Sequence, residues 1–206
     1  MNIEIKKSKK PVNYKEAITF MEKRLDRIYE RKADELLWIL NHPKVYTAGT
    51  SYNENEILDK SLKIIKTNRG GKITYHGPGQ IVVYFLIDLK KRNKNIKSLV
   101  TAIEETIIKT LKTYNIESFS DRKNIGIWTR HENKDKKIAA IGIKVKRWIA
   151  YHGFSININT DLRNFKKIIP CGIHEKEISN LKDIKNQDFS KIGDLITKNF
   201  IKILGN

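Results

Sequence analysis

Apolar side chains recur at intervals of three and four residues in three separate parts of the chain. This spacing places them on one face of an α-helix and predicts amphipathic helices over residues 14–31, 99–111 and 192–203. The first helix is preceded by Asn13 and contains Glu16, a pair with the spacing of a capping box. Each helix is expected to bury one apolar stripe and to expose the opposite face.

Six shorter runs lack this period and are rich in β-branched and aromatic residues, which is typical of strands. They span residues 35–40, 62–67, 81–87, 125–128, 137–145 and 148–157. The run over residues 81–87 is expected to be a central strand. Helices and strands do not alternate regularly along the chain. This order favours an α+β (α/β) fold in which helices flank a mixed or mostly antiparallel sheet.

The length of 206 residues suits one domain with a sizeable core, and we expect a single domain over residues 1–206. No repeat, low-complexity tract or linker rich in Pro or Gly divides the chain. Hydrophobic residues make up 39% and charged residues 31%, which indicates a globular protein. No apolar run is long enough to span a membrane, and no secretory signal is present. We therefore expect a cytoplasmic protein.

The formal net charge of +18 suggests an acidic partner, either a nucleic acid or an acidic protein. Lysine supplies most of this charge, whereas arginine, the side chain suited to bidentate phosphate and guanine contacts, is scarce. The abundance of Lys, Asn and Ile is also typical of an AT-rich genome. A nucleic-acid partner is therefore not expected.

Four glycines lie close together in residues 69–80, between two predicted strands. Glycine permits a positive φ and a close approach of backbone N–H groups to a ligand. The segment therefore predicts either a binding loop for an acyl or phosphate-bearing ligand or a hairpin with two tight turns. Gly-Lys-Ser/Thr does not follow at the required spacing, so this is not a phosphate-binding P-loop.

Cys171 is the one cysteine, which excludes an intramolecular disulfide and a cysteine-rich zinc site. A lone cysteine is usually a small buried residue, but Pro170 and Gly172 place this one on a turn, where its sulfur could face a cleft. Lys137 opens a strand of small residues, and nothing in the spacing connects it with Cys171. The histidines show no metal-binding spacing, and no metal ion or cofactor is expected.

Five segments, taken in order, resemble the lipoyl(octanoyl) transferase family of lipoate biosynthesis. They are HPKVYTAG at residues 42–49, RGGKITYHGPGQ at 69–80, KIAAIG at 137–142, HGF at 152–154 and PCGI at 170–173. Each segment alone is weak evidence, but five in the family's order cover most of the chain between residues 36 and 181. The resemblance implies the α/β fold shared with biotin and lipoate protein ligases.

The resemblance also implies an activity and its residues. Octanoyl would pass from octanoyl-acyl carrier protein to the target lysine of a lipoyl domain, through an acyl thioester on Cys171. Lys137 matches the family's lysine that lowers the cysteine pKa and acts as general acid and base. The matching substrate-binding residues are Arg69, Gly70, Gly71, Lys72, Ile73, Thr74, Tyr75 and His76; Ala140, Ile141 and Gly142; and Gly153, Phe154 and Ser155.

The implied acceptors are the lipoyl domains of 2-oxoacid dehydrogenase complexes and the glycine cleavage H protein. The nearest alternative is an ATP-dependent lipoate-protein ligase of the same fold, which would form an adenylate and need no cysteine. A cysteine hydrolase and a basic nucleic-acid-binding module are more distant alternatives. One departure from the family is visible: Ser179-Asn180 stands where a Thr-Ser pair is usual.

Overall fold

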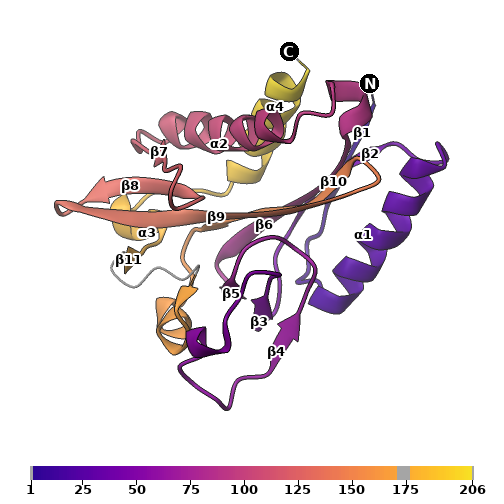
Figure 1. Cartoon of the computed structure of the whole chain (residues 1–206). Coiled ribbons are helices and arrows are strands. Elements are labelled where there is room, and N and C mark those ends of the chain that lie inside the picture. Colours follow the sequence, from indigo (N-terminus) through magenta and orange to yellow (C-terminus); the bar gives the residue numbers. More distant parts are fainter. Residues whose placement is uncertain (1, 171–176, 206) are drawn as a thin grey trace.

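The computed structural model describes residues 2–170 and 177–205, and its centre is a large mixed sheet (Figure 1). Its strand order is β1-β2-β6-β10-β9-β8-β7, and β11 pairs with β9. The strands are β1 (Ile3–Lys7), β2 (Glu35–Leu40), β6 (Gln80–Asp88), β7 (Phe119–Ser120), β8 (Ile127–His131), β9 (Lys134–Lys146), β10 (Ile149–Asn157) and β11 (Glu177–Ile178). The β1–β2 and β11–β9 pairs are parallel, and the others are antiparallel.

A second sheet has three short strands in the order β4-β3-β5. They are β3 (Val45–Ala48), β4 (Ile64–Lys66) and β5 (Ile73–His76). Short helical segments connect the elements: η1 (Glu54–Glu56), η2 (Leu89–Arg92), η3 (Leu162–Lys167) and α3 (Leu181–Ile184). Figure 1 shows the small sheet below the large one, on the side where α1 (Tyr14–Tyr29) also lies.

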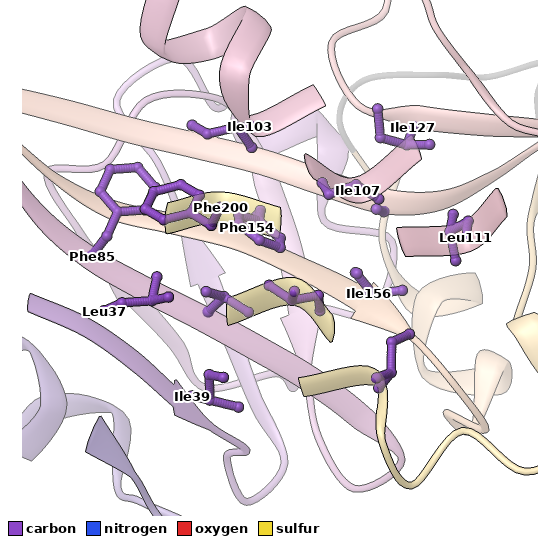
Figure 2. Packing of buried hydrophobic residues seen from close by; sticks show 14 of the residues in the cluster. Leu37, Ile39, Phe85, Ile103, Ile107, Leu111, Ile127, Phe154, Ile156 and Phe200 are labelled. Atoms are coloured by element: carbon purple, nitrogen blue, oxygen red, sulfur yellow. The ribbon is translucent and has the colours of Figure 1, made fainter. Parts of the chain in front are cut away.

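The larger core lies on the opposite face, under α2 (Ile96–Thr113) and α4 (Ile192–Leu204) (Figure 1). Apolar side chains of β2, β6 and β10 meet the apolar stripes of both helices there. Figure 2 shows Phe85 beside Phe200, and their ring centroids are 5.6 Å apart. Because both rings are fully buried, this contact fixes α4 against the centre of the sheet.

A second core joins α1 to the other face of the same strands. Met21 and Leu25 of the helix pack against side chains that include Trp38 and Tyr84. The side chain of Asn13 accepts a hydrogen bond from the Lys15 amide at 2.9 Å and caps the helix, as its sequence position predicted. The central strands are therefore covered on both faces, which explains why β2 is buried at every position.

The three predicted helices and six predicted strands are present, with ends shifted by a few residues. β8 begins at Ile127 instead of residue 125, because the preceding residues form the turn that carries Gly126. Periodicity in the sequence did not predict β1, β3, β5, β7 and β11. These strands have five residues or fewer, too few for a period to be recognised.

The predicted fold class is confirmed: helices flank a mixed sheet in an α+β arrangement. Within the described residues, no helix has the length and apolar composition needed to cross a membrane.

The Phe85–Phe200 contact predicts a large effect on stability. We expect Phe200→Ala to lower the free energy of unfolding by about 3–5 kcal/mol, because it leaves a cavity in the core. Urea denaturation followed by circular dichroism measures this loss. Ile201→Ala is the matched control on the same helix, where the side chain is 41% exposed and a change within about 0.5 kcal/mol is expected. Equal losses in both variants would contradict the assigned packing.

Candidate active site

A cavity of about 500 Å³ lies beside the large sheet. Residues of β5, β6, β9 and β10 line it, together with Tyr14 of α1, Val100 of α2, residues 123–125 and the loop over residues 69–72, here called the glycine loop. The volume is within the range of small-molecule sites. The polar segments of the sequence analysis, which are far apart along the chain, therefore meet around one space.

The glycine loop reaches this position through close backbone contacts. The Gly70 amide donates a hydrogen bond to the Ile143 carbonyl of β9 at 3.0 Å. A β-carbon on Gly70 would lie 2.8 Å from that carbonyl oxygen, and one on Gly49 would lie 2.2 Å from the Gly71 oxygen. Only residues without a side chain allow these approaches. The glycines of this segment therefore serve a packing requirement as well as any contact with a ligand.

Arg69 fastens the glycine loop to the small sheet. Its guanidinium donates to the Thr47 carbonyl at 2.8 Å, to the Thr47 hydroxyl at 2.9 Å and to the Gly70 carbonyl at 3.0 Å. The residue is 8% exposed, so its charge lies in a largely dry environment. A buried cation of this kind favours an anionic or strongly polar ligand in the adjoining cavity.

Lys137 enters the cavity from β9 and is 4% exposed. Its Nζ donates a hydrogen bond to the Ile125 carbonyl at 2.7 Å and lies 5.4 Å from the centroid of the Trp128 ring. In the described part of the chain, no carboxylate pairs with this ammonium group. Gly126 makes room for the side chain, because a β-carbon there would lie 2.4 Å from Lys137 Cε.

Cys171, the predicted nucleophile, lies outside the described residues. Where the description resumes, Ile178 of β11 pairs with Lys137, and the Ser179 amide donates to the Lys137 carbonyl at 3.0 Å. The next residue, Asn180, exchanges two hydrogen bonds with the backbone of Thr160, at 2.8 and 3.1 Å. In this chain the Asn180 amide therefore anchors β11 and α3 to the end of β10.

The His152 side chain lies on the cavity face because of its backbone conformation. Simple alternation along β10 would place it on the face of Phe154 and Ile156, in the core under α2 and α4. Instead its φ is +67°, and its ring lies 6.4 Å from Tyr84, with Nε2 bonded to Asn68 at 2.8 Å. Periodicity in the sequence could not have indicated this.

The buried histidines of the site are held neutral. Burial, with the charge of Arg69, lowers the pKa of His152 to about 3. Burial also lowers the pKa of His76 to about 3, with a further contribution from His42, although its hydrogen bond to Gln80 acts in the opposite direction. Neutral imidazole rings are compatible with an apolar ligand, whereas imidazolium ions would not be.

Most of the sequence-predicted site residues line the cavity. They are Arg69, Gly70, Gly71, Lys72, Thr74, His76, Lys137, Ala140, Ile141, Gly142, Gly153, Phe154 and Ser155. Ile73 and Tyr75 do not line it, because alternation along β5 directs both side chains to the other side, where they pack with Phe165. The arrangement does not support a substrate contact through these two side chains.

Several lining residues were not predicted from the sequence, among them Tyr14, Val82 and Tyr84. Each lies in a regular helix or strand and resembles an ordinary core position. No signal in the chain distinguishes them. Among the described residues, no group of histidine and carboxylate side chains has the arrangement of a metal site.

A cavity beside a mixed sheet, bordered by a glycine loop and lined by a buried lysine, is typical of an enzyme site. The chain is a member of the lipoyl protein ligase A/B catalytic domain family, whose model matches residues 13–200. The relatives that it resembles carry a more particular name. An octanoyltransferase of Ehrlichia ruminantium is 45% identical over 95% of this chain and 96% of its own length. An octanoyltransferase of Wolbachia sp. subsp. Brugia malayi is 41% identical over 93% of this chain and 95% of its own length.

Solved structures agree on the fold. A bipartite lipoate protein ligase of Thermoplasma acidophilum, studied with its E2 lipoyl domain, superposes with a TM-score of 0.73. It is 13% identical over 99% of this chain and 85% of that one. A lipoate-protein ligase A bound with ATP superposes with a TM-score of 0.71 at 15% identity. The match covers 100% of this chain and 86% of that one. The expected family, fold and class of enzyme, an acyltransferase of the octanoyltransferase type, are confirmed.

The neutral histidines predict a pH-dependent stability. The folded-state pKa of His152, about 3, lies below the ordinary value of about 6.5, so the unfolded chain binds a proton first as the pH falls. Stability is therefore complete above about pH 6.5 and decreases below it, by up to about 1.4 kcal/mol per pH unit for this one group. His152→Gln should remove that contribution.

Urea titrations of the wild type and of His152→Gln at pH 4.5, 5.5 and 7.0 measure the difference. We expect the gap between the two unfolding free energies to narrow, or to reverse, as the pH falls. Two parallel stability profiles would show that His152 titrates normally in the folded protein.

Proposed function

We propose that this protein transfers an octanoyl group from octanoyl-acyl carrier protein to the target lysine of lipoyl domains, through an acyl thioester on Cys171. Residues 1–206 form the catalytic domain in this proposal, and the reaction takes place in the cytoplasm. The names of the relatives support the transfer of octanoyl. The observation that carries the mechanism is the ammonium group of Lys137, which is buried in the cavity wall and pairs with no carboxylate among the described residues.

A buried ammonium ion without a carboxylate is costly, because desolvation is not offset by a nearby opposite charge. Such a site favours the anionic form of a neighbouring acid. An ordinary thiol has a pKa of about 8.5 and is only partly ionised at neutral pH, so a stabilising cation increases the fraction of thiolate. Lys137 is suited to this role, and Cys171 is the thiol that the sequence offers.

The reaction is a double displacement. The Cys171 thiolate attacks the carbonyl carbon of the octanoyl thioester, the bond to the carrier's sulfur breaks, and the carrier leaves as a thiol after taking a proton from the Lys137 ammonium group. The amine of the acceptor lysine then attacks the octanoyl-cysteine, an amide bond forms, and the Cys171 thiolate is released. The amine proton is removed in this second step, and Lys137 in its neutral form is the base that we assign.

The cavity accounts for the apolar substrate. Ala140, Ile141 and Gly142 line it with small or apolar groups, and each buried methylene of an acyl chain contributes about 0.8 kcal/mol. An octanoyl chain can therefore bind through its tail, while the thioester lies near Lys137.

The positive charge of the protein is suited to binding two acidic partners, the carrier protein and the lipoyl domain, one after the other at the same surface. The net charge is +18, and Lys123 is an exposed residue at the cavity. A basic surface increases the rate of encounter with an acidic carrier or lipoyl domain, and salt reduces this effect. The acceptors that we propose are the lipoyl domains of 2-oxoacid dehydrogenase complexes and the glycine cleavage H protein.

The covalent intermediate is the first prediction of this proposal. After incubation with octanoyl-acyl carrier protein and no ATP, intact mass spectrometry should show one added octanoyl group, which hydroxylamine removes. The Cys171→Ser variant should not gain an added group that hydroxylamine removes. The alternative, an ATP-dependent ligase, would give a different result. The wild type would then form no adduct, and its octanoylation or lipoylation of a lipoyl domain would require ATP.

The role of Lys137 is tested against its neighbour Lys136. We expect Lys137→Gln to slow acylation of the enzyme by about 10²–10⁴-fold, the usual contribution of a positioned acid or base. Lys136→Gln is the matched control, because Lys136 Nζ bonds to Glu132 at 2.6 Å and does not line the cavity. Alkylation of Cys171 by iodoacetamide as a function of pH provides a second measurement: its midpoint should rise toward about 8.5 in Lys137→Gln alone. An unchanged midpoint would exclude Lys137 as the stabilising cation.

A further inference from the structure

Five aromatic rings form a continuous group around the inner part of the cavity. They belong to Tyr14, His42, His76, Tyr84 and His152, here called the ring wall. Neighbouring centroids are 5.3 Å apart for Tyr14–His42, 5.8 Å for His42–His76, 5.6 Å for His42–Tyr84 and 6.4 Å for Tyr84–His152. All five residues are buried, and four of them line the cavity, whereas His42 lies behind Tyr84.

Hydrogen bonds fix the ring of Tyr84 within this wall. His42 Nδ1 lies 2.6 Å from the Val12 carbonyl oxygen, which can only accept, so Nδ1 carries the proton. His42 Nε2 is therefore an acceptor, and the Tyr84 hydroxyl donates to it at 2.9 Å. The Trp38 ring lies edge-on to the Tyr84 ring, and the two ring centroids are 6.3 Å apart. To turn aside, Tyr84 would have to leave a buried acceptor unpaired and displace an indole ring.

The two ends of the cavity differ in exposure. At one end Lys137 binds the Ile125 carbonyl, and Ile125 itself is 56% exposed and Lys123 is exposed. The ring wall lies farther along the sheet, because Tyr84 pairs with Gly153 of β10, and Gly153 pairs with Gly142, five residues from Lys137 on β9. The ring wall is buried, with His42 fully enclosed. A chain whose reacting group lies at Lys137 therefore points its tail at the ring wall.

We propose that Tyr84, held in place by His42, forms the end of the acyl cavity and sets the length of the acyl chain that this enzyme accepts. The inference rests on the proposed function, because it takes Lys137 as the reacting end. A wall of apolar side chains could adjust its rotamers to a longer tail. The hydrogen-bonded ring of Tyr84 stops the chain at a fixed distance from Lys137, and a longer acyl group must leave methylenes exposed or displace the ring.

Tyr84→Leu tests this proposal, because it shortens the side chain at the end of the cavity. Tyr151→Leu is the matched control: Tyr151 is also a fully buried tyrosine on the same face of the sheet, but it does not line the cavity. Each variant is offered an equimolar mixture of hexanoyl-, octanoyl-, decanoyl- and dodecanoyl-acyl carrier protein, and the acyl-enzymes are quantified by intact mass.

One methylene group contributes about a fourfold preference. We expect Tyr84→Leu to raise the ratio of decanoyl to octanoyl enzyme by about tenfold, while Tyr151→Leu leaves the wild-type ratio unchanged. A change smaller than about twofold in Tyr84→Leu, or an equal shift in Tyr151→Leu, would overturn the proposal.

Val82→Leu gives a second, milder test at a residue that also lines the cavity. By adding one carbon atom it should favour hexanoyl over octanoyl by about fourfold, and an unchanged ratio would count against a fixed cavity end. Calorimetric binding of the free fatty acids of six to twelve carbons, without any reaction, repeats the comparison. If the wild type forms no acyl-enzyme, the proposed mechanism fails, whereas the binding series still decides whether Tyr84 limits chain length.

Discussion

A contact between backbones, between the glycine loop and β9, determines the width of the cavity. The Gly70 amide bonds to the Ile143 carbonyl, and the Gly49 and Gly71 backbones approach so closely that a β-carbon would collide. Arg69 then ties the loop to Thr47. With the loop held in this position, Thr74 and His76 of the small sheet face Ala140 and Ser155 of the large sheet across the cavity. A side chain at these glycines would force the two sheets apart and widen the site.

The sequence predicts features that repeat along one element, but it does not predict contacts between separate elements. The stripes of α1, α2 and α4 and the apolar run of β6 were visible in the sequence because each repeats a period over many residues. The ring wall was not visible, since Tyr14, His42 and Tyr84 come from separate elements and meet only after the sheets pack. The position of His152 depends on one positive φ, which alternation cannot reveal. The site motifs were recognised as segments, whereas Ile73 and Tyr75 show that a motif does not indicate which of its side chains face the cavity.

The two ends of the cavity differ in their electrostatic character. At one end the Lys137 ammonium group pairs with no carboxylate of residues 2–170 and 177–205, an arrangement suited to stabilising a negative charge on the reacting group. At the other end the histidines remain neutral in spite of their polarity, and their hydrogen bonds go to Val12, Gln80 and Asn68 within the protein. Polar rings can therefore surround an apolar tail, because their polar atoms are largely bonded before the tail arrives. In the proposed function, the reacting group and the tail of the acyl chain therefore bind in different parts of the same cavity.

The charge of Lys137, which pairs with no carboxylate in the described part of the chain, also affects the stability of the protein. An apolar side chain of similar length would fill the same space beside Trp128 without the desolvation of an ammonium ion. Selection for thermal stability alone would therefore remove the lysine. Under the proposed mechanism the lysine trades stability for activity, and a variant library screened only for resistance to heat would accumulate inactive proteins at this position.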